Sequence, residues 1–407
     1  MKKLHGLMAV LLSAILYSLA LFDINNLFYL SAPALIALLV VILKNNIKYN
    51  ALLVCCAWLP IVVFSHYVWL FYLLNTKLGA STAWSVALYC ALSLLHLLCF
   101  ILFFNTGLMV WYFANRIACF HRYQGVFFIF IFTSSFQAAG LMLMFILDAQ
   151  GSYNVMSPVI PLAKFFMPPS RLSGDNFIKS RNKAYSINLV SGISFLKIAK
   201  NASHNLNLWA SSQNLFHAMQ QAPARGVVVT PESFISCPLN REPEFLSFVQ
   251  QSIGQHQMLM LAGQYESVDG QLFQAVYALT HEGVEHLYLK QHAVPCVERM
   301  PRYLQFWKKG HSIFKAEQSF ASASSNETVG FCFAETRIIP RVCSDFFLIT
   351  TVMDLIKWRR TFGKNCIVVV HVNDSWFVEY MRDLLRHVAH MRAWMADINI
   401  LYVDCGI

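Results

Sequence analysis

Charge is nearly absent from the first 150 residues of this 407-residue chain, and this feature most restricts what the chain can fold into. Those residues hold nine charged side chains, whereas the remaining 257 hold 43. An ordinary soluble domain is about 25% charged. The first part is therefore typical of a membrane segment, and the second, at about 17% charge, of a soluble domain with a large core.

Five apolar stretches in the first part approach or exceed the about 20 residues that a helix needs to cross a bilayer. They are 6–22, 27–43, 51–74, 83 to about 104, and 125–147. Lys2 and Lys3 precede the first stretch, as in a signal peptide, but no small-residue cleavage site follows it. We therefore expect residues 1–150 to form an all-α, multi-span membrane bundle of about five helices.

Orientation follows from lysine and arginine, which accumulate on the cytoplasmic side of a membrane. They lie before the first stretch, between the second and third, and between the fourth and fifth: Lys2, Lys3, Lys44, Lys48, Arg116 and Arg122. The other loops offer Asp23 and Lys77. This alternation predicts a multi-pass protein of a bacterial inner membrane, with a cytoplasmic N-terminus and a periplasmic region from residue 149. A sixth span in the charge-free run 78–115 would reverse that sidedness.

The pattern changes after a segment rich in Pro, Ser and Asn, 151–184, which we expect to be an interfacial linker. From residue 185, short β-branched runs alternate with longer helical ones, which favours an α/β or layered domain over 185–407. The expected helices are 205–222, 243–255, 350–360 and 376–396. The expected strands are 186–190, 227–230, 258–263, 272–279, 286–290, 329–334, 338–343, 366–372 and 398–403.

Three of these strands end at reactive side chains. VVVTPESF leads into Glu232, LYLKQHAVPCVE carries Lys290, and IIPRVCSDFF carries Cys343. A thiolate is a strong nucleophile, a carboxylate can act as its base, and an ammonium can stabilise both the thiolate and a developing oxyanion. One Glu, one Lys and one Cys at strand ends therefore predict an acyl-transfer site.

Each of these residues also has a structural explanation. A cysteine at a strand end is commonly a small buried hydrophobe, and Cys332 in VGFCFA competes for the role of nucleophile. Glu232 could stabilise a helix N-terminus, and Lys290 could be a solvated charge on an edge strand.

Other chemistries have weaker support. His387 and His390 share a helix face, but no Cys or acid at ligand spacing joins them, so we expect no metal site. The net charge of +10 is spread evenly over the two parts, without the clustered Lys and Arg of a nucleic-acid footprint. The spacing of the eleven cysteines suggests no disulfide framework.

The order of these motifs resembles that of the carbon-nitrogen hydrolase (nitrilase) superfamily, and of the membrane-bound apolipoprotein N-acyltransferases within it. The resemblance covers about 185–407 and rests on VVVTPESF, the K-x4-P-x2-E of KQHAVPCVE, the Cys343 element, HVNDSWF and HMRAWMADINILYVDCG. Glu232 precedes Lys290 by 58 residues, and Lys290 precedes Cys343 by 53. The resemblance implies a four-layer αββα sandwich. Because the chain stops at Ile407, inside the last motif, it also implies a C-terminally shortened domain.

The same resemblance implies roles. Glu232 would be the general base, Lys290 the oxyanion-stabilising residue and Cys343 the nucleophile that takes an acyl group as a thioester. The supporting residues would be Glu298, Asp345, Asn373 and Trp376. The implied acyl donor is a phospholipid, the acceptor is the N-terminal amine of a diacylglyceryl lipoprotein, and no metal or organic cofactor is required.

Departures from the family pattern leave other functions open. Thr230 stands where the acyltransferases usually have Trp, and Ser344 and Asp345 stand where they have an aromatic residue and Glu. Pro340 lies within the strand that leads to Cys343 and removes a ladder donor from it. Conjugal transfer proteins of the TraB type also resemble a membrane anchor joined to a nitrilase-like domain. A degenerate domain that binds without catalysis is the third interpretation.

Overall fold

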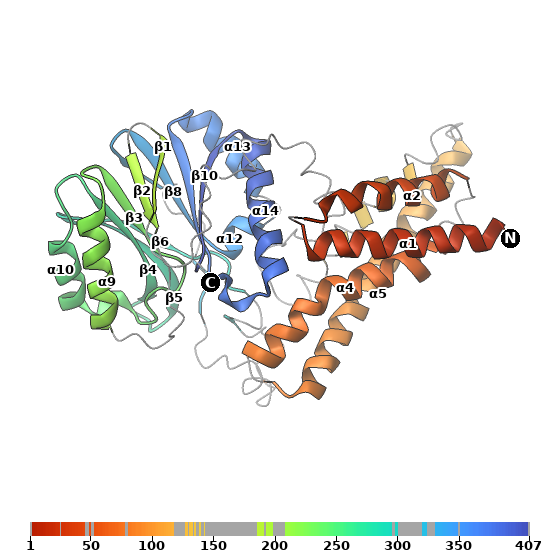
Figure 1. The fold of residues 1–407 in the computed structure, drawn as a ribbon, viewed down its shortest axis with the longest axis horizontal. Helices are drawn as coiled ribbons and strands as arrows, with labels where there is room; N and C mark the ends of the chain where they lie inside the picture. The colour runs from red at the N-terminus through yellow and green to blue at the C-terminus, as the bar shows by residue number, and fades with distance from the viewer. Residues whose placement is uncertain are drawn as a thin grey trace. The chain divides into compact units, whose positions relative to one another are not determined.

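The computed structural model of the chain describes residues 2–24, 26–44, 49, 53–77, 80–117, ten positions between 127 and 142, 185–190, 193–197, 208–294, 298–299, 320–323, 330–348 and 351–405. The chain divides into two compact units. One comprises Met1–Met167 with Ile313–Lys315 and Phe377–Val388, and the other comprises Pro168–Ser312, Ala316–Trp376 and Ala389–Ile407. The first is helical, and the second holds both β-sheets (Figure 1). The predicted linker 151–184 lies outside the described residues.

Among its described residues, the helical unit has three helices long and apolar enough to cross a membrane, at Leu4–Phe22, Val54–Thr76 and Thr82–Phe113. Its elements are α1 (Lys2–Phe22), η1 (Phe28–Leu30), α2 (Ser31–Lys44), η2 (Val54–Trp58), α4 (Leu59–Tyr72), η3 (Leu73–Lys77) and α5 (Thr82–Ile117). The three long helices correspond to the first, third and fourth predicted spans. The second predicted span corresponds to the short turn η1 and the 14-residue α2, which has Pro33 in its first turn.

The fourth predicted span is longer than expected. The structure has one continuous helix of 36 residues, α5, across the charge-free run in which we considered a sixth span. Because that helix has no break, the run offers no turn between two crossings. The fifth predicted span, 125–147, lies mostly outside the described residues, although its ten described positions are helical.

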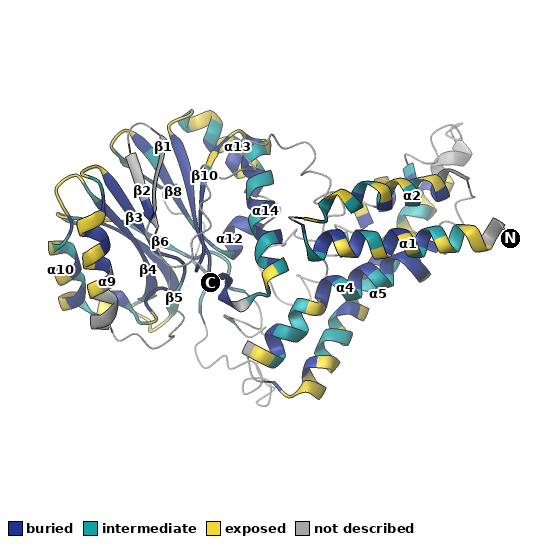
Figure 2. Cartoon of the chain, in the orientation of Figure 1, coloured by how far each residue is buried: buried dark blue, intermediate teal, exposed yellow. Residues whose placement is uncertain are grey.

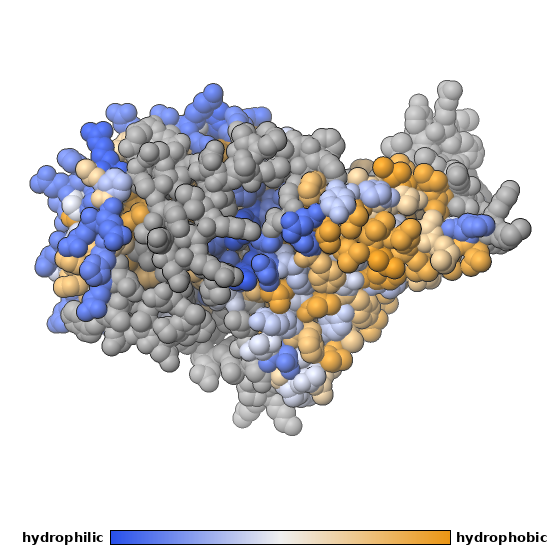
Figure 3. Space-filling view, in the orientation of Figure 1, coloured by the Kyte–Doolittle hydropathy of each residue, from blue (hydrophilic) through white to orange (hydrophobic). Residues whose placement is uncertain are grey.

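Apolar side chains cover much of the face of this unit that Figure 3 shows. On α1 they recur every three or four residues, which places them on one helix face: Leu4, Met8, Leu12, Ile15 and Leu19. The opposite face is buried against other helices. Interhelical hydrogen bonds join polar groups inside the unit, as where Trp58 Nε1 donates to Ser13 Oγ at 3.1 Å. An exposed stripe of large aliphatic side chains suits lipid rather than water.

The α/β domain contains a six-stranded sheet in the order β1-β2-β3-β4-β5-β6. Its strands are β1 (Tyr185–Val190), β2 (Ile193–Lys197), β3 (Gly226–Val229), β4 (Met258–Glu266), β5 (Leu272–Thr280) and β6 (Gly283–Leu289). β1 and β2 form an antiparallel hairpin, whereas a single strand was expected to open the domain.

A second sheet has the order β10-β9-β8-β7. Its strands are β7 (Phe331–Phe333), β8 (Thr336–Val342), β9 (Cys366–His371) and β10 (Asn399–Val403). Pro340 does not interrupt β8, whose parallel register with β9 continues through Pro340 opposite Val369 to Val342 opposite His371. β8 and β9 are buried along most of their length (Figure 2).

The two sheets pack face to face through alternate residues of their strands. Val227 and Val229 of β3 point toward the second sheet, whose Ile367 and Val369 meet the same core, while Val228 points the other way. Burial on both faces explains why these strands are continuous apolar runs rather than alternating ones.

Helices cover the outer faces of both sheets. On the first sheet they are α9 (Leu208–Gln221), η5 (Leu239–Arg241) and α10 (Pro243–Gln251). Beside the second are α12 (Ser344–Phe347), α13 (Thr351–Phe362), η7 (Asp374–Trp376) and the part of α14 (Glu379–Ala396) that begins at Ala389. This arrangement confirms the predicted fold class, a helical N-terminal region followed by a four-layer αββα domain.

Candidate active site

Strand direction brings the predicted site residues to the same end of each sheet. In the first sheet, β3 and β4 are parallel, and two antiparallel pairings carry that direction to β6. The carboxyl ends of β3 and β6 therefore lie at the same end of the sheet, and they are followed by Glu232 and Lys290. In the second sheet β8 and β9 are parallel, so Cys343 and Asn373 likewise follow strands at the same end of that sheet. Packing of the two sheets places these two ends beside each other.

Glu232 lies just beyond β3 and is 3% exposed. Pro231 has no N–H, so the backbone ladder to β4 stops there. Thr230 extends the connection through its side chain, because its Oγ1 accepts a hydrogen bond from Ala262 N at 2.8 Å. The Glu232 carboxylate is then held at both oxygens, by Lys290 Nζ at 2.8 Å and by Asn373 N at 3.0 Å. Glu232 is therefore a fixed acceptor rather than the helix-stabilising acid considered above.

Lys290 is buried, with 1% of its surface exposed, and it is not the solvated edge charge that the sequence allowed. Its ammonium donates to Glu232 Oε1 at 2.8 Å and to Glu298 Oε1 at 2.7 Å. The other oxygen of Glu298 accepts from Val294 N at 2.7 Å, which fixes that carboxylate in turn. A buried ammonium is tolerated only when opposite charges and hydrogen bonds compensate its lost hydration. The two carboxylates supply both.

Cys343 stands at the junction between β8 and the short helix α12, and it is partly exposed. Its backbone φ is 39° and its ψ is −102°, a conformation that a side chain with Cβ rarely adopts. Two backbone hydrogen bonds hold it there, from Cys343 N to His371 O at 2.8 Å and from Phe346 N to Cys343 O at 3.0 Å. Strained residues held by their surroundings cluster at functional sites.

The electrostatics couple these four side chains. Burial would lower the pKa of Lys290, but Glu232, Glu298 and Cys343 raise it well above its ordinary value, so the ammonium stays charged. Burial raises the pKa of Glu298 to about 7, and Glu232 adds to this while Lys290 opposes it. Burial and the Glu232 carboxylate raise the pKa of the Cys343 thiol well above its ordinary value, against the opposing effect of Lys290. The Cys343 side chain is therefore a neutral thiol beside the Glu232 carboxylate.

Asp345 connects α12 to the loop that follows Lys290. Its Oδ2 accepts from Tyr288 OH at 2.6 Å and Gln291 N at 2.9 Å. Its Oδ1 accepts from His292 N at 2.8 Å, and His292 Nδ1 lies 2.9 Å from the same oxygen. Ser344 Oγ donates to His292 O, which adds a second tie. Ser344 and Asp345 thus position the Lys290 loop against α12.

Asn373 contributes through its backbone, whose N–H binds Glu232. Its side-chain oxygen accepts from Ser375 Oγ at 2.6 Å and from Cys405 Sγ at 3.3 Å, so it stabilises the turn after β9. Trp376 ends η7, and its side chain lies outside the described part of the chain. The sequence motifs around NDSW and DCG therefore meet in one turn beside Glu232.

Arg392 of α14 is a residue that the sequence analysis did not single out, although it lies in the HMRAWM segment. It is 3% exposed, and its guanidinium donates to Phe346 O, Phe347 O and Leu348 O at the end of α12. Burial lowers its pKa to about 10. A cation at a helix C-terminus satisfies carbonyls that have no helical partner. The available signal was a charged residue on the apolar face of a helix.

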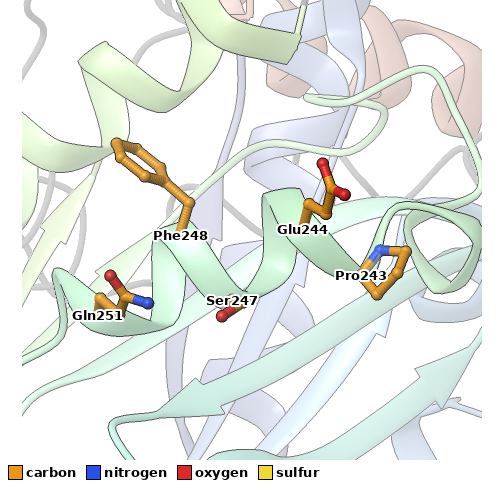
Figure 4. A pocket seen from close by; sticks show the side chains of 5 residues that line it. All are labelled: Pro243, Glu244, Ser247, Phe248 and Gln251. Carbon is orange, nitrogen blue, oxygen red and sulfur yellow. The ribbon is translucent and has the colours of Figure 1, made fainter.

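Other candidates lie apart from this cluster. Cys332 is exposed on β7, where its sulfur accepts from Arg337 Nη1 at 3.6 Å. Within the described ranges, no three His, Cys, Asp or Glu side chains could together hold a metal ion. A cavity of about 440 Å³ lies along α10 and is lined by Pro243, Glu244, Ser247, Phe248 and Gln251 (Figure 4). None of the predicted site residues lines that cavity.

Comparison with known proteins gives structural neighbours of low identity. No family model matches the sequence, and no curated protein matches it. A glutamine-dependent NAD+ synthetase from Acinetobacter baumannii is similar over 55% of this chain and 38% of its own, with 16% identity and a TM-score of 0.38. A second such synthetase, from Cytophaga hutchinsonii, is similar over 44% of this chain and 30% of its own, with 13% identity and a TM-score of 0.30. A carbon-nitrogen hydrolase from Helicobacter pylori G27 is similar over 52% of this chain and 72% of its own, with 13% identity and a TM-score of 0.37.

Proposed function

We propose that this protein is a membrane-bound acyltransferase that moves an acyl chain from a phospholipid, through a thioester on Cys343, to the N-terminal amine of a lipoprotein. The observation that carries the proposal is the buried arrangement of Glu232, Lys290 and Glu298 around the strained Cys343. Its charges act directly on the thiol. Candidate membrane spans on the same chain would hold such a site close to its lipid substrates.

The proposed chemistry has two balanced steps. In the first, the Cys343 sulfur attacks the ester carbonyl of the phospholipid while Glu232 takes the thiol proton. The acyl–oxygen bond breaks, and that proton passes to the departing lysophospholipid alcohol. In the second, the lipoprotein amine attacks the thioester carbonyl, an amide forms as the acyl–sulfur bond breaks, and a proton from the amine passes through Glu232 to the Cys343 sulfur. Lys290 stabilises the oxyanion in both steps, which is the role of a positioned cation in a water-poor site.

Location and sidedness belong to the same proposal. We place the chain in a bacterial inner membrane as a multi-pass protein, with its N-terminus in the cytoplasm and the α/β domain in the periplasm. The charge asymmetry of the loops supports this orientation. Both reactants, the phospholipid and the diacylglyceryl lipoprotein, would then lie at the outer leaflet beside the domain.

The test is direct detection of the acyl-enzyme. Full-length protein in membranes containing phospholipid should acquire a hydroxylamine-sensitive mass increment of one acyl chain on the peptide that contains Cys343. Cys343→Ala should abolish the increment, and the matched Cys332→Ala should retain it. Complementation of a strain depleted of its own lipoprotein acyltransferase should follow the same pattern.

Two outcomes would reject the proposal. Loading on another cysteine would show that Cys343 is not the nucleophile. A folded protein that loads no acyl chain in intact membranes would point to a role in conjugal transfer or to a domain that only binds.

A further inference from the structure

His371 is a polar residue in an apolar row. It ends β9, and side chains alternate along a strand, so it faces the same way as Ile367 and Val369, which pack between the two sheets. Its exposed fraction is 0%. An imidazole therefore occupies a position where the pattern of the strand predicts an aliphatic side chain.

Two hydrogen bonds connect His371 to both halves of the candidate site. Its carbonyl accepts from Cys343 N at 2.8 Å. Its Nδ1 lies 2.6 Å from the carbonyl oxygen of Thr230, which only accepts, so Nδ1 carries the proton and donates. Thr230 precedes Glu232 by two residues, and Asn373, two residues after His371, binds the Glu232 carboxylate through its N–H. The end of β9 thus spans from the nucleophile to its base.

The other ring nitrogen of His371 makes this residue more costly than an aliphatic one that only fills space. Nε2 is buried, and no described residue forms a hydrogen bond with it. Burial lowers the pKa of His371 to about 4, so the ring is neutral at ordinary pH. A buried polar atom without a partner is costly, and an aliphatic residue would avoid that cost. The bond from Nδ1 to Thr230 is the gain that offsets it.

We propose that His371 is a positioning residue that sets the separation between the Glu232 carboxylate and the Cys343 thiol across the two sheets. This inference rests on the proposed function only in taking Cys343 as the nucleophile. It assigns part of the register of base and nucleophile to one side-chain bond between the sheets. Without that bond, the Glu232 segment keeps the bond from Asn373 N at the end of β9 but loses the one from the His371 ring.

Three substitutions separate the Nδ1 bond from simple filling of space. In His371→Asn the amide nitrogen takes the place of Nδ1, whereas in His371→Gln it reaches the place of Nε2. His371→Leu fills the volume and donates nothing. His286→Leu is the matched control, because His286 also has a buried Nε2 without a hydrogen bond among the described residues and lies on β6, and no hydrogen bond joins its ring to Thr230 or Cys343.

The readout is the pH dependence of iodoacetamide alkylation at Cys343, followed by site-resolved mass spectrometry on the folded full-length protein. Glu232 raises the pKa of the Cys343 thiol, so its displacement lowers the midpoint of alkylation. We expect His371→Gln and His371→Leu to lower the midpoint by about one pH unit, which is a tenfold change in the ionisation constant of the thiol. His371→Asn and His286→Leu should keep the wild-type midpoint.

The comparison of Asn with Gln carries the test even where the Leu variant does not fold. An unchanged midpoint in His371→Gln, or equal shifts in the Asn and Gln variants, would overturn the inference. Alkylation needs no acyl donor. Absence of acyl loading in wild type, together with the expected shifts, would therefore reject the proposed function and retain the role of His371.

Discussion

The helical unit and the α/β domain place the same residue types on opposite sides. On α1 and α5 large aliphatic side chains face outward, and Leu98 is 63% exposed. In the domain they face inward, and Leu259 is 0% exposed. The buried polar groups differ as well. Those that bond between the helices are neutral, as with Ser13 and Trp58, whereas the domain buries an ammonium and two carboxylates in contact.

This difference indicates what each unit is built for. Neutral hydrogen bonds suffice to hold apolar helices together in lipid. Buried ions are costly and rarely improve stability over well-packed apolar residues. The domain accepts that cost around one cysteine, and this is the arrangement on which the proposed chemistry rests.

The largest expected effect comes from removing the ammonium. Lys290→Met leaves two buried carboxylates without their cation, and we expect it to lower the free energy of unfolding of the domain by about 3–5 kcal/mol. Denaturant unfolding monitored by a domain signal measures this change. Lys364→Met, at an exposed lysine, is the control and should stay within about 0.5 kcal/mol of wild type. Equal effects at both positions would show that the charge cluster is solvated.

Matched leucine truncations test the contrast between the two units. Leu259→Ala should cost about 2–5 kcal/mol, because it opens a cavity between packed layers. Leu98→Ala should change the stability of the detergent-solubilised protein by less than about 0.5 kcal/mol, because its side chain faces the surroundings rather than another helix. A cost at Leu98 comparable to that at Leu259 would mean that protein, not lipid, covers this face of α5.

Much of the fold could be predicted because buried strands and exposed helix faces leave regular patterns. Val227, Val228 and Val229 are all apolar, since both faces of β3 are covered. The positions of Glu232, Lys290 and Cys343 at strand ends were also visible, although their mutual contacts were not. Arg392 and His371 escaped notice because their partners are backbone carbonyls distant in sequence. No residue pattern shows which carbonyl a fold will bring to a side chain.

Two buried groups should give opposite pH dependences of stability. The pKa of His371 falls from 6.5 to about 4, so between these values the unfolded chain holds a proton that the folded chain lacks, and stability rises with pH. The pKa of Glu298 rises from 4.5 to about 7, so over that window the folded chain holds the extra proton, and stability falls as pH rises. The two slopes oppose each other between pH 4.5 and 6.5.

Single substitutions separate these slopes. Relative to wild type, His371→Asn should become more stable as the pH falls from 6.5 to 4, by roughly 3 kcal/mol in total. Glu298→Gln should change in the opposite sense relative to wild type and lose stability as the pH falls from 7 to 4.5, by a similar amount. Denaturant unfolding at intervals of half a pH unit measures both. Parallel curves for wild type and either variant would exclude that group as a titrating contributor.

The smallest expected effect concerns the backbone of Cys343. Because its φ is 39°, glycine should relieve strain that alanine retains. We expect Cys343→Gly to be about 1 kcal/mol more stable than Cys343→Ala, while neither loads an acyl chain. Equal stabilities of the two variants would indicate that the conformation at this position carries no strain. Thermal unfolding of the two variants side by side is the measurement.

The length of α5 sets a condition on any bilayer that this helix crosses. Its 36 residues extend about 54 Å at 1.5 Å per residue, whereas the hydrocarbon of a typical bilayer is about 30 Å thick. Even a tilt of about 40°, the upper end of the usual range, leaves the helix longer than that layer. In a bilayer, this hydrophobic mismatch would make the covered apolar area of α5 depend on bilayer thickness, since a thicker membrane covers more of that surface than a thin one.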